Sequence, residues 1–244
     1  MKFHTHVLYL AVIGFVGVTS FANASYVLVN GGFEDTSGTF PTGWSKGGSG
    51  TVSAGAGFVS GSSADALMTA GAVMSQDFSG ATVASAENYD FQLDFAFRTS
   101  GISTTTDQRF RLRDNNNTGD LITLGFESAA TGGGTALSYF SGTWQRGIDV
   151  AFAASTTYYF RVNGYDLDLA SRYYTLSYST DGVNYVTSAN ITGFHFAPVG
   201  SDFETVAFDA GTQTTRIDSV TVVPEPAAAL LGTLGLFGLL RRRR

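Results

Sequence analysis

The side chains that most often do covalent or acid–base chemistry are scarce in this chain. Beyond residue 24 there is no cysteine, and His195 is the single histidine. A serine–histidine–aspartate relay would have to use His195, which lies in the run Phe194-His195-Phe196 with no serine-elbow motif nearby. A zinc site built on several histidine or cysteine ligands is excluded by the same count.

Paired carboxylates are the remaining route to catalysis, because a glycosidase needs only two of them. The Glu-x-Asp-x-x-Glu strand pattern of jelly-roll glucanases is absent. The glutamates between residues 25 and 223 stand apart from one another along the chain, at Glu34, Glu87, Glu127 and Glu204. The sequence therefore favours a non-enzymatic protein, with a polysaccharide-active enzyme as the competing class.

The two tryptophans, Trp44 and Trp144, are candidates for stacking against the apolar faces of sugar rings. A tryptophan is more often a core residue than an exposed platform. Trp144 follows the turn-like run Ser141-Gly142-Thr143, which favours partial exposure. We therefore take Trp144 as the candidate ligand-binding residue.

A basic stripe is predicted on one strand face, formed by Arg109, Arg111 and Arg113. Asp94 and Asp107 lie on or beside the preceding predicted strand, so cross-strand ion pairs are one explanation. A footprint for an anionic polysaccharide is the other.

Alternating apolar and polar residues predict that β-strands carry these side chains. The segment Tyr89–Arg98 places five apolar residues on one face. The same period of two recurs between Gly- and Asn-rich turns over Gln108–Asp114, Leu121–Glu127, Thr157–Asn163, Arg172–Ser179 and Phe203–Asp209. One hydrophobic face per strand is typical of two antiparallel sheets packed face to face. We predict an all-β, two-sheet antiparallel β-sandwich of jelly-roll type over residues 25–223, with Gly47–Ser63 as long loops within it.

The predicted domain is strongly acidic. Residues 25–223 hold 9 of the 14 Lys and Arg and 19 of the 20 Asp and Glu, a net charge of −10. Such a surface disfavours nucleic acid and anionic membranes as partners. It suits solubility, cation binding or neutral glycans, and a domain of this length needs no disulfides.

The first 24 residues have the organisation of a secretory signal peptide. Lys2 precedes the apolar run Val7–Val18, and Ala22-Asn23-Ala24 is a small-x-small cleavage site. We expect an N-terminal signal helix that signal peptidase removes, which leaves Ser25 as the first mature residue.

The chain ends in a second processing segment, residues 224–244. Pro224, Glu225 and Pro226 precede the uncharged run Ala227–Leu240, and the cluster Arg241, Arg242, Arg243 and Arg244 follows it. Fourteen residues make a helix of about 21 Å, shorter than a hydrocarbon core of about 30 Å, but snorkelling and local thinning accommodate a short span. The arginines hold the C-terminus in the cytoplasm. A tail anchor that is never cut is the alternative to a processed one.

This order of elements resembles the PEP-CTERM sorting signal of Gram-negative surface proteins. The resemblance covers only the C-terminus, and it implies cleavage at or near Pro224-Glu225-Pro226 by an exosortase, a membrane-embedded transpeptidase. It implies that the protein is exported, transiently anchored in the inner membrane by a short transmembrane helix, and then released to the cell surface or the extracellular space. It also implies association with exopolysaccharide, biofilm or floc matrix.

The start and end of the predicted domain resemble galactose-binding-like carbohydrate-binding modules. The start has Asn30-Gly31-Gly32-Phe33-Glu34 and then Pro41-x-Gly43-Trp44, and the closing strand is Arg216–Val222. The resemblance implies a structural calcium held by Glu34 and Asp218. Alternation supports it, because Asp218 would share the inward face with Val220 and Val222, and a buried carboxylate needs a partner or a cation. The alternative is an aspartate hydrogen-bonded beside Arg216 or to a backbone amide.

The central stretch is equally similar to laminin-G or concanavalin-type jelly rolls. Asp166 and Asp168 precede Arg172-Tyr173-Tyr174, and the turn Ser179-Thr180-Asp181-Gly182 follows. Both kinds of family are two-sheet sandwiches, but a glycan would lie on a sheet face in one and on edge loops in the other. We therefore expect weak polysaccharide binding without a site assigned, or, as a third class, a self-associating coat protein.

Overall fold

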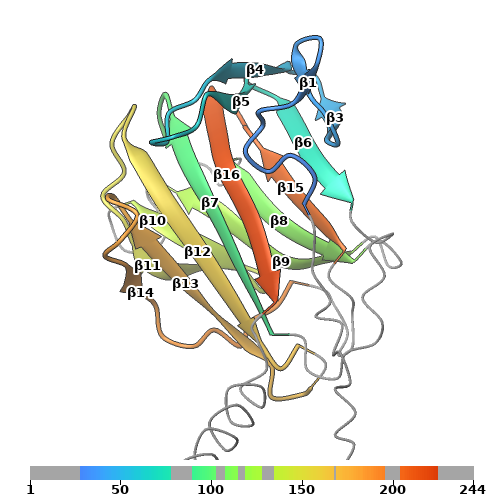
Figure 1. Ribbon diagram of the computed structural model, residues 1–244. Helices are drawn as coiled ribbons and strands as arrows, with labels where there is room; N and C mark the ends of the chain where they lie inside the picture. The colour runs from blue at the N-terminus through green and yellow to red at the C-terminus, as the bar shows by residue number, and fades with distance from the viewer. Residues whose placement is uncertain are drawn as a thin grey trace, which may run out of the picture.

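The computed structural model describes residues 28–77, 90–102, 108–114, 119–127, 135–167, 169–195 and 204–224. Over these residues the chain forms two seven-stranded antiparallel sheets and a two-stranded ribbon. Figure 1 shows the two sheets packed face to face. The predicted two-sheet β-sandwich is therefore confirmed. In the described ranges no helix has the length and apolar character that crossing a bilayer requires.

One sheet, which we call the β7 sheet, has strands from both halves of the chain. Its order is β14 (Val186–Thr187), β13 (Tyr173–Ser179), β12 (Thr157–Tyr165), β7 (Phe91–Thr99), β16 (Thr215–Pro224), β5 (Ala64–Met68) and β4 (Val52–Ala56). In Figure 1 it is the nearer sheet, and β16 lies between β7 and β5.

The other sheet, the β8 sheet, lies behind it in the same view. Its order is β11 (Trp144–Asp149), β10 (Ala136–Phe140), β9 (Gly119–Glu127), β8 (Arg109–Asp114), β15 (Thr205–Asp209), β6 (Ala72–Asp77) and β3 (Ser45–Gly48). The small ribbon pairs β1 (Thr36–Ser37) with β2 (Phe40–Pro41).

An aromatic layer fills the space between the sheets. Side chains alternate between the two faces of a strand, and Phe95 and Phe97 on the inward face of β7 are almost fully buried. The Phe95 ring lies 4.9 Å from that of Phe110 on β8, and the Phe97 ring lies 4.1 Å from that of Phe126 on β9. Burying one such side chain stabilises a domain by about 1.5–3 kcal/mol, so this layer accounts for a stable fold without cysteines.

The prediction of long loops over Gly47–Ser63 is wrong at its start, where Gly47 and Gly48 belong to β3, and in its middle. Strand β4 lies there as the edge strand of the β7 sheet, paired along its whole length with β5. Its sequence is Val-Ser-Ala-Gly-Ala, and only Val52 is buried. Small side chains give no alternation signal, and pairing of the backbone holds such a strand in place.

Candidate functional site

The two N-terminal motifs fold onto each other. The Asn30 side-chain amide donates to the Thr42 carbonyl at 3.2 Å, and the Trp44 indole Nε1 donates to the Asn30 carbonyl at 3.2 Å. The Trp44 ring lies 5.2 Å from that of Phe33, and only 6% of Trp44 is exposed. Trp44 is therefore a core residue and not a sugar platform.

A β-bulge in β16 decides where Asp218 lies. The pairing register of β16 with β7 shifts after Asp218, and Ser219 has a left-handed φ of 52°. Asp218 pairs with Ala96, whereas Val222 pairs with Leu93, and these two partners lie on opposite faces of β7. The prediction that Asp218 shares the inward face with Val220 and Val222 is therefore wrong, because the bulge inverts the alternation of side chains along β16.

The first described loop of the chain packs on this bulge. The Val220 backbone N–H donates to the Gly31 carbonyl at 2.9 Å. A Cβ atom on Gly31 would overlap the carbonyl oxygen of Val220. The close approach of the two backbones therefore requires glycine at this position of the motif, and it brings the loop that carries Glu34 next to β16.

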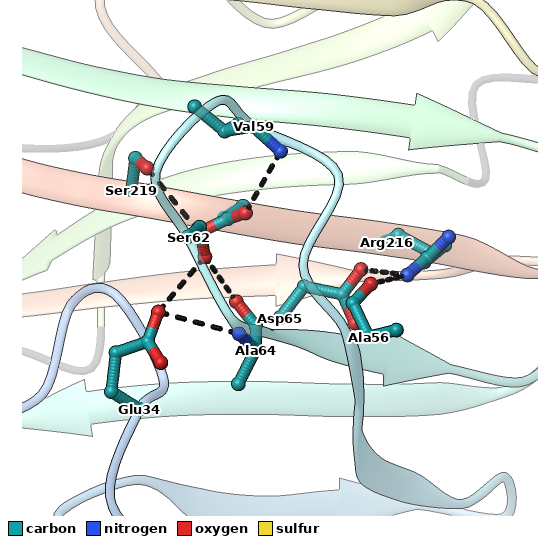
Figure 2. Close-up of polar contacts among 9 residues, drawn as sticks. Glu34, Ala56, Val59, Ser62, Ala64, Asp65, Arg216 and Ser219 are labelled. Atoms are coloured by element: carbon teal, nitrogen blue, oxygen red, sulfur yellow. Dashed lines mark hydrogen bonds and ion pairs between the residues drawn. The ribbon is translucent and has the colours of Figure 1, made fainter.

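Asp218 lies on the outward face of the β7 sheet and is nevertheless fully buried. Figure 2 shows the loop between β4 and β5 crossing over this part of β16. The Val59 N–H donates to Asp218 Oδ2 at 3.4 Å, and the hydroxyls of Ser62 and Ser219 donate to Oδ1 at 3.1 and 3.2 Å. The alternative to calcium, an aspartate hydrogen-bonded to a backbone amide, is therefore met in part by the Val59 N–H.

Glu34 reaches the same serine from the other side (Figure 2). Its Oε1 lies 3.0 Å from the Ser62 hydroxyl oxygen and accepts a hydrogen bond from the Ser63 N–H at 2.8 Å. The Ser62 hydroxyl also lies 2.5 Å from the Ala64 carbonyl oxygen. We call Glu34, Ser62, the Ala64 carbonyl and Asp218 the Ser62 cluster. Three acceptor oxygens surround one hydroxyl, which has a single proton to donate.

Sequence reasoning missed Asp65, a fully buried carboxylate on the adjacent strand β5. Its Oδ2 lies 2.5 Å from Arg216 Nη2, and Arg216 also donates to the Ala56 carbonyl. Arg216 was expected beside Asp218 in one alternative, and instead it neutralises Asp65. The short pattern Ala-Asp-Ala-Leu-Met of β5 was a weak strand signal, which is why the aspartate was overlooked.

Burial shapes the electrostatics of these carboxyl groups. Burial raises the pKa of Asp218, and hydrogen bonds, chiefly from Ser62, oppose the rise. Burial also raises the pKa of Asp65, where the Arg216 charge opposes the rise and the Asp218 charge adds to it. Hydrogen bonds from Ser63 lower the pKa of Glu34. Asp65 already has the Arg216 cation beside it, whereas the described partners of Asp218 are N–H and hydroxyl donors. A cation near Asp218 would therefore favour its charged form.

In the described part of the chain, no group of three or more His, Cys, Asp or Glu side chains is placed to hold a metal ion. A cation at the Ser62 cluster would therefore bind two carboxylates, a hydroxyl and a carbonyl oxygen. All-oxygen ligand sets of this kind suit calcium. The Ser62 cluster offers four oxygens, whereas a calcium ion takes about six to eight.

Trp144 lies on the outward face of the β8 sheet, at the start of edge strand β11. It pairs with Phe140 of β10, and the two rings are 5.3 Å apart in an edge-to-face contact. The Arg109 guanidinium lies 5.8 Å from the Trp144 ring, and Phe140 contacts the His195 ring at 4.4 Å. We call these four residues the Trp144 face. The half-buried indole is held by its neighbours but keeps exposed surface.

His195 has a packing role at this face. Its Nδ1 lies 2.8 Å from the Thr123 hydroxyl and 3.6 Å from Asp120 Oδ2. Burial lowers the pKa of His195, and the Asp120 charge partly opposes that shift. A lowered pKa favours the neutral imidazole, and the hydroxyl that it contacts belongs to a threonine.

Two of the three arginines in the predicted basic stripe form ion pairs, which agrees with the first of the two explanations for the stripe. Arg109 contacts Trp144, and the other two arginines pair across strands at 2.8 and 2.7 Å, Arg111 with Asp209 and Arg113 with Asp120. Asp94, a predicted partner, lies in the β7 sheet instead and binds Arg161 at 2.7 Å. Asp94 was misassigned because β7 and β8 follow each other in sequence but belong to different sheets.

Several predicted residues lie outside the described ranges. Pro224 is the last residue of β16 and pairs with Phe91 of β7. The rest of the sorting motif and the arginine cluster lie outside the described ranges: Glu225, Pro226, Arg241, Arg242, Arg243 and Arg244. The signal peptide also lies outside them, as do three internal acidic residues, Glu87, Asp107 and Asp168.

No family model matches this chain, and no curated protein matches it. Several solved structures are similar to it in fold. The globular domain of Trypanosoma cruzi calreticulin is 12% identical with a TM-score of 0.50, over 82% of this chain and 91% of that one. Domain 4 of AbnA, an extracellular arabinanase from Geobacillus stearothermophilus in complex with arabinotriose, is 13% identical with a TM-score of 0.48, over 83% and 92%. An alginate lyase from Aplysia kurodai is 10% identical with a TM-score of 0.48, over 71% and 87%. Of these three, the calreticulin domain reaches a TM-score of 0.50, and at 12% identity that likeness shows a shared fold alone.

Proposed function

We propose that this chain is an exported, non-enzymatic jelly-roll protein that binds polysaccharide weakly through the Trp144 face. The observation that carries the proposal is the partly exposed indole of Trp144 on a sheet surface, with the Arg109 guanidinium at 5.8 Å and Phe140 at 5.3 Å. An indole offers a large apolar face that stacks on sugar rings, while its neighbours hold it in one orientation. The Arg109 guanidinium adds a planar, charged group beside the indole.

Affinity at one such site should be modest. A single aromatic stack leaves most of the sugar solvated, so we expect a dissociation constant on the order of 10 μM to 1 mM, about −7 to −4 kcal/mol. Display of many copies on a surface would then supply avidity for a polymer.

The test is a panel of polysaccharides titrated into the full-length chain and its Trp144→Ala variant. We expect saturable binding of at least one polysaccharide and a loss of about tenfold or more in the variant. Gln145→Ala on the same strand is the matched control and should bind like the unmodified chain. Equal binding by the two forms would rule out the Trp144 face, and self-association without any glycan would favour the coat-protein alternative.

The non-enzymatic part of the proposal rests on the carboxylates beside the Trp144 face. Asp209 is paired with Arg111 and Asp120 with Arg113. An ion pair of this kind occupies carboxylate oxygens that catalysis would need. We therefore expect no reducing ends to be released from any polysaccharide of the panel. Release that is abolished by changing one glutamate would establish the competing enzyme class.

Export and sorting belong to the same proposal, with signal peptidase and an exosortase as processing partners. Replacing Pro224-Glu225-Pro226 by three alanines should leave the full-length chain in the inner membrane, because the arginine cluster holds the segment while the cleavage motif is gone. Fractionation followed by immunoblotting measures this. Normal appearance of the variant in the outer layers or the medium would contradict the sorting assignment.

We also propose that the Ser62 cluster holds a structural calcium ion through Glu34 and Asp218. The support is the convergence of Glu34 Oε1, Asp218 Oδ1 and the Ala64 carbonyl on one hydroxyl. Calcium would supply the positive charge that the buried Asp218 lacks.

A further inference from the structure

A second polar site lies on the β7 sheet. A pocket of about 180 Å³ opens where β7 ends and β16 begins. A single water needs only about 10–15 Å³, so the pocket admits a group of several heavy atoms. Its lining consists of two guanidinium groups and four hydroxyl-bearing residues: Arg98, Thr99, Ser100, Ser155, Thr214 and Arg216. Each of these side chains carries a hydrogen-bond donor, and not one is a carboxylate. The Thr99 hydroxyl already donates to the Gly101 carbonyl at 2.7 Å, so the donors for a ligand come from the other side chains.

The two arginines stand directly opposite each other. Arg98 of β7 pairs with Arg216 of β16 in the strand register. Like charges placed opposite each other on neighbouring strands are destabilising. Asp65 offsets this repulsion for Arg216, because the Oδ2 atom of Asp65 lies 2.5 Å from the Nη2 atom of Arg216. Across the described ranges, no ion pair or hydrogen bond involves the Arg98 side chain. The pocket thus contains a guanidinium that lacks a counter-charge.

Backbone hydrogen bonds between three segments build the pocket. The Ser100 N–H donates to the Thr214 carbonyl at 2.9 Å, and the Thr214 N–H donates to the Ser100 hydroxyl at 3.2 Å. The Ser155 N–H donates to the Thr99 carbonyl at 2.8 Å, and Ser155 has a left-handed φ of 60°. A non-glycine residue in that conformation is strained and persists only where its surroundings hold it. These bonds hold the backbone around the pocket in place, and the Ser100 hydroxyl is held by the bond that it accepts from Thr214.

We propose that this pocket binds the carboxylate or sulfate group of an acidic polysaccharide, with Arg98 as its main ligand. The guanidinium fork matches both oxyanions and forms two parallel hydrogen bonds to either. The acidic domain as a whole repels anions, so an anionic group would be held only where a local cationic pocket recognises it. This proposal rests on polysaccharide binding as the function, and it names the chemical class of the polymer.

The experiment uses small anions, so that it does not depend on the Trp144 face. Sodium sulfate, sodium D-glucuronate and D-glucose are each titrated into the full-length chain at constant ionic strength, and binding is followed by calorimetry or NMR. We expect saturable binding of sulfate, glucuronate or both, and none of glucose. Arg98→Gln should weaken it by about tenfold or more, the usual cost of a lost charge-assisted hydrogen bond. Arg146→Gln on β11 of the other sheet, which removes the same charge, should change it less than twofold.

Melting curves of each variant show whether the fold is kept. Arg98→Lys keeps the positive charge but loses the forked guanidinium, so it should bind the anions with intermediate affinity. The preferred anion identifies the polymer as uronate-containing or sulfated. No saturable binding of either anion, or an equal loss in Arg146→Gln, would overturn the proposal. If the anions bind while Trp144→Ala has no effect on any polysaccharide, the Trp144 face is refuted and the pocket stands.

Discussion

Replacing Trp44 with alanine should destabilise the domain strongly. The ring is 94% buried, packs between Phe33 and Phe208, and donates its indole N–H to the Asn30 carbonyl. A buried tryptophan replaced by alanine costs about 3–5 kcal/mol, which in a domain of this size lowers the melting midpoint by about 6–20 °C. Thermal unfolding followed by circular dichroism measures the shift.

Trp144→Ala is the matched comparison, because it removes the only other tryptophan. Trp144 contacts Phe140 and Arg109 at the sheet surface and keeps exposed area, so its loss should lower the midpoint by only a few degrees, corresponding to about 1 kcal/mol. Equal destabilisation by the two variants would mean that Trp144 is also a core residue.

Calcium should stabilise the folded chain. A ligand that binds only the folded state and is present at 100 times its dissociation constant adds about 2.7 kcal/mol. For a domain of this size the melting midpoint should rise by about 5–10 °C between EDTA-treated and calcium-loaded protein. Calorimetric scans with and without the ion measure the difference.

Asp218→Asn should abolish the calcium response, because the amide keeps the shape of the side chain and removes its charge. Asp149→Asn is the control, since Asp149 lies on β11 with a side chain that is 76% exposed, and it should respond like the unmodified chain. Superimposable curves with EDTA and with calcium would show that the Ser62 cluster is held by hydrogen bonds alone.

The strands with large alternating side chains could be predicted because burial on one face leaves a period of two in the sequence. Thr157–Asn163 lies within β12, and Leu121–Glu127 within β9. Strand β4 left no such trace, since its side chains are too small to mark a face. The assignment of strands to sheets was equally hidden, because it depends on contacts between distant segments, and Asp94 was therefore given a partner in the wrong sheet.

The site was predicted less completely than the fold. Glu34 and Asp218 do meet at Ser62, but the resemblance to carbohydrate-binding modules suggested the pair, and alternation placed Asp218 on the wrong face. A bulge inserts one extra residue into a strand. In a single sequence its one trace here is Ser219 within a strand-like run. Arg98 was missed because nothing local distinguishes an arginine without a counter-charge from a paired one.

The most direct test of polysaccharide binding at the Trp144 face uses the two indole N–H signals of the ¹⁵N-labelled full-length chain. Only two exist, and Trp44→Phe or Trp144→Phe assigns them. On titration with a binding polysaccharide, the Trp144 signal should shift progressively and saturate. The Trp44 signal should stay in place, because its N–H is bonded to the Asn30 carbonyl inside the fold. A stationary Trp144 signal under saturating polysaccharide would contradict the account.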